Sequence, residues 1–217
     1  MARYLLFRKV MKTPIKYIVS IVALTAALTL PARATFEKET APFGGSFLFF
    51  DVANSNVTDL TAFVGANDPS APTVAIHTDG PVDTGSGFAT IKPSSGSNLT
   101  ELIFTPDDPN LFSDFNFRGQ LTDAGDGTVT VTVQDNQGNL PQTFTFDNLG
   151  TNQDFARQGI ISFDGETIQS VTITSDFKEF KQIRISFATG VPDGGATVML
   201  LGAALGAFGM ARRFLKS

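Results

Sequence analysis

Residues 128–133 read Thr-Val-Thr-Val-Thr-Val, the most regular pattern in this sequence of 217 residues. Successive side chains of a β-strand point to opposite faces of the sheet, so this pattern places valines on one face and threonines on the other. Both residue types are β-branched and pack well on a pleated surface. We therefore predict a strand with one face against a hydrophobic core and the other toward water.

The same alternation recurs along the chain. Apolar and polar residues alternate over 115–121 and 182–187, and within 167–175 Ile168 is out of step with Val171, which predicts a β-bulge. Further strands are predicted at residues 46–53, 58–64, 73–78, 87–92, 100–105, 142–146 and 159–163.

Clusters of Asn, Asp, Gly and Pro separate these strands at short intervals. They predict turns, including a hairpin at Asp164-Gly165, and the end of a strand at residues 79–81. Residues 151–158 are compatible with one helical turn, and no other part of the body has helical periodicity. About ten or eleven short strands at this spacing are typical of an all-β fold. We predict an antiparallel, jelly-roll-like β-sandwich.

The C-terminal tail, residues 191–217, has the layout of a sorting signal. Residues 196–211 are apolar and would span roughly 24 Å as a helix, which predicts a transmembrane helix slightly shorter than a bilayer core. The basic end, residues 212–217, predicts a stop-transfer signal held in the cytoplasm by Arg212, Arg213 and Lys216. The segment before the span cannot continue a strand or helix because it contains proline and paired glycines; it consists of Val191, Pro192, Asp193, Gly194 and Gly195.

These five residues, the apolar span and the basic end resemble the sorting tails of the PEP-CTERM class of exported bacterial proteins. The resemblance is to the variant that begins Val-Pro-Asp-Ser-Gly or Val-Pro-Asp-Gly-Gly; because Gly194 stands where the commoner form has serine, the cleaved bond is left open. The resemblance implies processing by an exosortase, a membrane-embedded cysteine transpeptidase. It also implies transient anchoring in the inner membrane and a final place on the cell surface or outside the cell. The alternative is an ordinary C-terminal membrane anchor.

The body resembles the same class. Its strands and turns over residues 102–187, including the runs 115–121 and 165–173, are similar to the bodies of uncharacterised PEP-CTERM exported proteins. The strand layout is also similar to that of galactose-binding-like sandwiches, at the level of fold alone. Neither resemblance implies an activity.

The N-terminus has the three regions of a secretory signal peptide. Residues 1–16 carry basic residues and no acid, residues 18–30 are apolar, and Ala32 and Ala34 are the small residues of a cleavage site. We predict a signal helix over residues 1–34 that directs the chain to the secretion translocon, with translation starting at Met1 or Met11. A retained N-terminal anchor is the alternative. Residues 35–190 would then form the mature β-sandwich domain.

The composition of this domain excludes several functions. Residues 35–190 hold seven basic residues and 20 acids, a net charge of −13, whereas a protein that binds nucleic acid needs a basic surface. The sequence has no cysteine and one histidine, so disulfides, thiolate chemistry and a His-rich zinc site are excluded. The domain also lacks tryptophan and tyrosine; its phenylalanines are predicted to fill the core, which disfavours carbohydrate binding.

Aspartates in several loops could bind Ca²⁺, which prefers oxygen ligands, although their spacing matches no known calcium motif. Aspartate also stabilises turns through side-chain to backbone hydrogen bonds, so both interpretations stay open. The candidate metal ligands are Asp107, Asp108, Asp123, Asp126 and Asp135, and calcium is the one cofactor that the sequence suggests.

No catalytic motif stands out, and we predict that the protein is not an enzyme. His77 lies mid-strand without a nucleophile motif nearby, and Arg118 is expected to pair with an acid of the domain. The sequence therefore predicts a structural or ligand-binding protein of the cell envelope or extracellular matrix, with exopolysaccharide as a candidate partner. The alternatives are a calcium-dependent carbohydrate-binding module and a secreted hydrolase.

Overall fold

The structure is a computed structural model that describes residues 36–39, 44–66, 68, 70–107, 111–123, 126–163, 166–188 and 202. The chain divides into two compact units, residues 1–33 and 34–217, and every described residue lies in the second. The predicted signal peptide, sorting residues 191–195 and basic end lie outside the described residues, as does the predicted span apart from residue 202. Within the described ranges, no helix is long and apolar enough to cross a membrane.

Thirteen strands account for most of the described chain. In chain order they are β1 (Phe36–Glu39), β2 (Ser46–Phe50), β3 (Val57–Val64), β4 (Thr73–Thr84), β5 (Gly87–Phe88), β6 (Thr90–Pro93), β7 (Glu101–Pro106), β8 (Phe112–Leu121), β9 (Val129–Asp135), β10 (Gln142–Phe146), β11 (Gln158–Ser162), β12 (Ile168–Thr174) and β13 (Phe177–Phe187).

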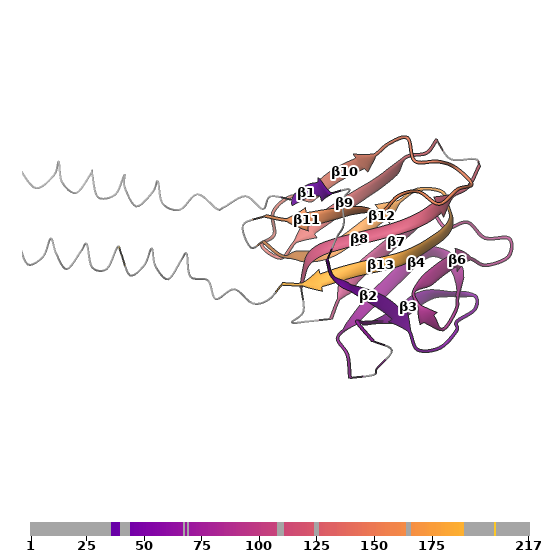
Figure 1. Cartoon of the computed structure of the whole chain (residues 1–217), viewed down its shortest axis with the longest axis horizontal. Helices are drawn as coiled ribbons and strands as arrows, with labels where there is room; N and C mark the ends of the chain where they lie inside the picture. The colour runs from indigo at the N-terminus through magenta and orange to yellow at the C-terminus, as the bar shows by residue number, and fades with distance from the viewer. Residues whose placement is uncertain are drawn as a thin grey trace, which may run out of the picture. The chain divides into compact units, whose positions relative to one another are not determined.

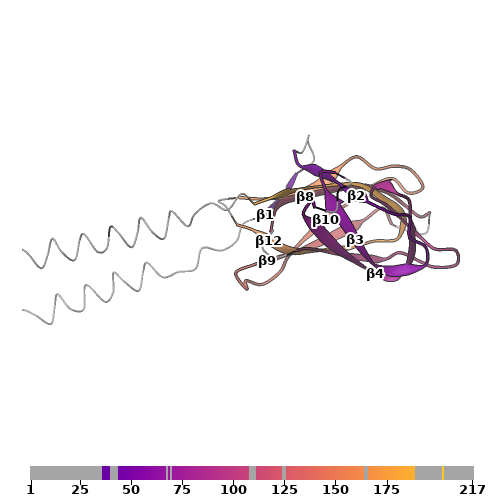
Figure 2. The same ribbon diagram turned by 90° about the horizontal axis from the view of Figure 1, so that it is seen from below.

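The strands form two layers that continue into each other. The pairing order is β1-β11-β8-β13-β2 in the first layer and β3-β4-β7-β12-β9-β10 in the second, and β2 pairs with β3 where the layers join (Figure 1). The view from below separates β1, β8 and β2 from β12, β9 and β4 (Figure 2). The chain passes between the layers at β7–β8, β8–β9, β10–β11, β11–β12 and β12–β13. These crossings, together with antiparallel pairing of the named strands, confirm the predicted all-β antiparallel sandwich.

Phenylalanine rings hold the two layers together. The ring of Phe104 on β7 lies 4.8 Å from that of Phe115 on β8, and Phe117 on β8 lies 6.3 Å from Phe146 on β10. Phe117 also stacks on Phe180 of β13, at 5.2 Å between ring centres. Such pairs contribute about 0.5–1.5 kcal/mol beyond the burial of their area. The buried phenylalanines of the described residues are Phe36, Phe50, Phe104, Phe112, Phe115, Phe117, Phe146, Phe155, Phe177 and Phe180.

Two local predictions are confirmed. Val129, Val131 and Val133 of β9 are fully buried, as the Thr-Val alternation predicts. The register between β12 and β9 shifts between Ile168 and Ser170, which is the bulge expected from the parity of Ile168. Both features are local, so a short stretch of sequence is enough to predict them.

Two other predictions are wrong. Residues 151–158 form no helical turn. Residues 79–81 do not end a strand, because β4 runs through them. In the pairing of β3 with β4, Asp59 faces His77 whereas Val57 faces Val82, so residues 78–81 of β4 face only residue 58. A bulge of this size accommodates Gly80 and Pro81 inside a strand.

Candidate functional site

The three arginines of residues 35–190 gather on the outer face of the first layer. Arg118 lies on β8 and Arg184 on β13, which pairs with β8, while Arg157 directly precedes β11, the partner of β8 on its other side. All are partly buried. We call Arg118, Arg157 and Arg184 the arginine cluster.

A bulge at Gln182 allows β13 to contribute to this face. Lys181 pairs with Arg118 and Arg184 pairs with Asn116, so three steps along β13 match two steps along β8. In a regular strand, residues three apart point to opposite faces. The extra residue is Gln182, which has a left-handed backbone with φ of 50°, uncommon for a residue other than glycine. The bulge therefore lets Lys181 and Arg184 share one face.

Gln182 also binds two of the arginines. Its backbone carbonyl accepts a hydrogen bond from Nη1 of Arg157 at 2.7 Å. Its Oε1 lies 3.3 Å from Nη2 of Arg157 and 3.4 Å from Nη1 of Arg118, so one oxygen lies between the two guanidinium groups. Nε of Arg118 donates to the carbonyl of Phe155 at 3.2 Å. These contacts fix the positions of both groups.

Arg184 is held by an aromatic ring. Its Cζ lies 3.9 Å from the centre of the Phe47 ring on β2, and Cζ of Arg157 lies 5.9 Å from the same centre. A guanidinium over an aromatic face is attracted by the ring quadrupole. Arg184 and Phe47 are also register partners across β13 and β2.

The cluster has many donors and few acceptors. A guanidinium can donate about five hydrogen bonds and accepts none. Asn116, fully buried on β8, accepts a bond from Arg157 through Oδ1, but its own Nδ2 has no hydrogen-bond partner among the described residues. The surroundings therefore supply fewer acceptors than Arg118, Arg157 and Asn116 can use.

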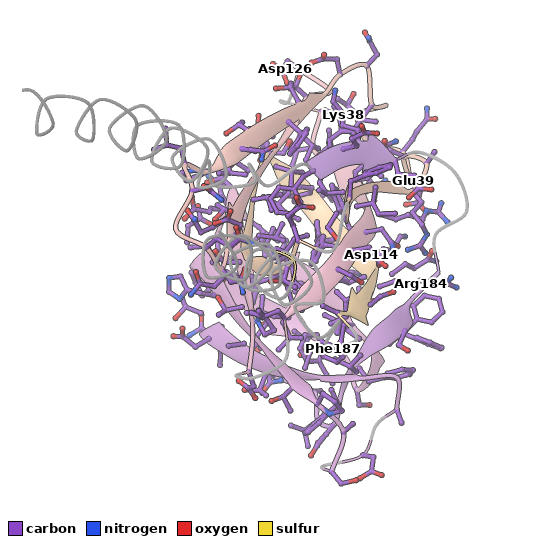
Figure 3. The ribbon with its side chains drawn as sticks, turned by 90° about the vertical axis from the view of Figure 1, so that its left-hand side faces the viewer. Lys38, Glu39, Asp114, Asp126, Arg184 and Phe187 are labelled. Atoms are coloured by element: carbon purple, nitrogen blue, oxygen red, sulfur yellow. The ribbon has the colours of Figure 1, made fainter. Side chains whose placement is uncertain are left out.

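Arg118 shares its carboxylate with a lysine. Asp154 lies 3.5 Å from Nη2 of Arg118 but 3.0 Å from Nζ of Lys181, so it is shared. Burial raises the pKa of Asp114, which lies on the same side of the molecule as Arg184 (Figure 3). The pKa of Arg157 is lowered, first by burial and then by the charges of Arg184 and Arg118. The three guanidinium groups are therefore close enough to affect one another, in a domain with a net charge of −13.

The sequence pointed to only one of these residues. Arg118 was expected to pair with an acid, and it does approach Asp154. Arg157 and Arg184 carry no signal in the linear sequence, because the three arginines are distant along the chain. Only the outward positions of Arg118 and Arg184 in alternating segments could have suggested a shared surface.

Several of the predicted calcium ligands serve turns. Asp126 accepts a hydrogen bond from the backbone of Thr128 at 2.9 Å, and Asp123 accepts one from Asn152 at 3.1 Å. Asp135 is buried and binds the backbone N–H groups of two loop residues. Asp107 is exposed, and Asp108 lies outside the described residues. In the part of the chain that the structure describes, no three His, Asp or Glu side chains are grouped as metal ligands, and calcium binding stays a prediction.

His77 forms an exposed pair on the second layer. Its Nδ1 lies 2.7 Å from Oδ1 of Asp59, its register partner on β3, beside a shallow hollow of ≈ 250 Å³. This hydrogen bond is the main cause that lowers the pKa of Asp59. Cross-strand pairs of this kind are common on sheet surfaces. The position agrees with the interpretation of His77 as a strand residue.

Curated proteins and solved structures give no functional assignment for the chain. No curated protein matches the chain. Among solved structures, the chain is similar to a carbohydrate binding module of family 29, with 10% identity over 71% of this chain and 90% of that one and a TM-score of 0.27. It is also similar to CBM32-2 of GH31 bound to GalNAc, with 12% identity over 71% of this chain and 98% of that one and a TM-score of 0.26. TM-scores this low give no information on what the chain binds.

A family model matches the C-terminal tail. The model described as the VPDSG-CTERM motif covers residues 190–214, which include the five sorting residues, the apolar span and both arginines of the basic end. This confirms the resemblance drawn from the sequence. Residues 190–214 are therefore a PEP-CTERM-type sorting tail, the sorting domain of an exosortase substrate.

Proposed function

We propose that this protein is an exported, non-enzymatic protein of the cell envelope whose β-sandwich binds an anionic ligand through the arginine cluster. The sorting tail supports export toward the cell surface. On this route the translocon admits the signal peptide, the span anchors the chain transiently in the inner membrane, and an exosortase then processes the tail.

The observation that carries the ligand-binding role is the gathering of the three arginines on one face of an acidic domain. Residues 35–190 contain 20 acids, which could pair with every arginine if the role were only structural. Yet within the described residues Arg157 has no carboxylate within 4.0 Å, the distance at which the other ion pairs form. An external oxyanion would supply the missing negative charge and acceptors.

Energetics support this role. Like charges held close together near a protein surface repel each other. The fold keeps three guanidinium groups within mutual influence and adds a left-handed residue, Gln182, to do so. Strain of this kind is typically found at functional sites. Arginine is also the side chain best suited to planar oxyanions, because its fork donates two parallel hydrogen bonds.

Titration of the full chain, purified in detergent, with dextran sulfate tests this proposal. We expect binding that weakens about tenfold or more in Arg157→Gln and Arg184→Gln, since a hydrogen bond to a charged group contributes about 1.5–3 kcal/mol. Lys38→Gln is the matched control, because Lys38 lies over the Phe146 ring, away from the cluster. Absence of binding, or equal losses in all three variants, would contradict the proposal.

A further inference from the structure

Outward-facing phenylalanines continue the arginine cluster across the same face. Phe47 and Phe49 alternate with buried residues on β2, so both point outward, and Phe88 on β5 is the register partner of Phe49. The ring of Phe88 lies 5.0 Å from that of Phe47 and 4.7 Å from that of Phe49. Phe88 is 59% exposed. We call these three residues the aromatic strip.

This strip departs from the prediction that the phenylalanines fill the core. Ten phenylalanines of the described residues are buried, whereas Phe88 is exposed and Phe47 and Phe49 are half-buried. Exposed apolar surface that is contiguous and bordered by polar groups commonly marks a binding site. We therefore expect the strip to bind a ligand that has apolar faces.

The strip and the cluster share a residue. Phe47 contacts Phe88 on one side and lies under Arg184 on the other. β2, β13, β8 and β11 lie side by side, and strand spacing of about 4.8 Å gives the surface a width of about 14 Å. A ligand lying across it would meet flat apolar rings first and guanidinium groups next. The width of the surface exceeds the length of a single sugar ring and therefore suits a polymer.

We propose that the aromatic strip and the arginine cluster form one elongated site for an acidic polysaccharide. The apolar C–H faces of its sugar rings stack on Phe88, and its carboxylate or sulfate groups bind Arg184, Arg157 and Arg118. This inference rests on the proposed function and adds the class of ligand.

Three polymers separate the two parts of the site. Polygalacturonate has sugar rings and carboxylates, dextran has sugar rings without charge, and polyglutamate has carboxylates without sugar rings. We expect the full chain to bind polygalacturonate at least tenfold more tightly than either of the other two. Dextran sulfate, compared with polygalacturonate, shows whether sulfate or carboxylate is preferred.

The variants test each contact. Phe88→Ala should weaken polygalacturonate binding about fivefold or more, since a stacked ring contributes roughly 1 kcal/mol, and should leave polyglutamate binding unchanged. Leu140→Ala is the matched control, because Leu140 is an equally apolar residue, 86% exposed, in the loop between β9 and β10 of the second layer. Equal melting temperatures would establish that both variants fold.

The outcomes distinguish this inference from the proposed function. If polyglutamate binds as tightly as polygalacturonate and Phe88→Ala has no effect, the site accepts anions generally; the proposed function then stands and the polysaccharide inference is wrong. If no anionic polymer binds, or Arg184→Gln binds as wild type does, both are wrong. If the chain instead self-associates in sedimentation through its arginines and binds no polymer, a second acidic copy is the ligand and the inference also fails.

Discussion

Because Gln182 has a left-handed backbone, we predict that replacing it by glycine leaves the protein more stable than replacing it by alanine, which is the reverse of the usual order. Gln182 is the extra residue of the β13 bulge, and its φ is 50°. We consider two substitutions, Gln182→Gly and Gln182→Ala. Both remove the Oε1 that lies between Arg157 and Arg118, so they differ only in their backbone preferences.

The expected difference follows from two opposing effects. A left-handed conformation costs a residue with a Cβ about 1–2 kcal/mol, which glycine avoids. Glycine loses more conformational entropy on folding, which costs roughly 0.5–1 kcal/mol relative to alanine. The net free energy of unfolding should therefore be higher for the glycine variant, by up to about 1.5 kcal/mol. At a regular strand position, the alanine variant should instead have the higher free energy of unfolding.

Urea denaturation of both variants measures this difference, and a change of 1 kcal/mol corresponds to about 2–4 °C in melting temperature for a domain of this size. Thr132, in the regular ladder between β9 and β10, is the control position, and there the alanine variant should be the more stable one. If Gln182→Ala is as stable as Gln182→Gly while Thr132 behaves as expected, the residue is not left-handed. The account of how Lys181 and Arg184 share a face would then be refuted.

Further predictions concern the core, the buried acid, calcium and the tail. Phe117→Ala should lower the free energy of unfolding by about 3–5 kcal/mol in urea, because Phe117 is fully buried; a loss under 1 kcal/mol would contradict its central place in the core. Burial raises the pKa of Asp114 above 3.8, so its charged form destabilises the folded state above that raised pKa and has no effect once pH falls below 3.8. Asp114→Asn should therefore stabilise the protein near neutral pH and lose this advantage in acid, as pH-dependent denaturation would reveal. If the aspartate loops bind calcium, stability should rise by about 2.7 kcal/mol at a hundredfold excess over Kd, whereas equal melting temperatures in chelator and millimolar calcium would exclude it. Replacing Pro192 and Asp193 by alanines should leave a full-length species in the inner membrane on immunoblots of fractionated cells, and wild-type processing would mean that the tail is an ordinary anchor.

The sequence alone determined the features that depend on neighbours along the chain. Alternation over residues 128–133 predicts that Val129, Val131 and Val133 are buried, since the period of a strand is two residues whatever the strand pairs with. The parity of Ile168 predicts a bulge for the same reason. The VPDSG-CTERM motif is likewise contiguous, so it can be identified without any fold.

Only the tertiary structure decided where the binding face lies. Arg118, Arg157 and Arg184 meet because β8 lies between β11 and β13, an order set by how the two layers close around the phenylalanine core. The bulge at Gln182 then changes which side chains of β13 face outward, and a single extra residue reverses that parity. Phe47, Phe49 and Phe88 similarly meet because the short strand β5 pairs with β2. Strand neighbours and ladder register are long-range properties, fixed by packing free energy summed over the whole core, so no local pattern of residues encodes them.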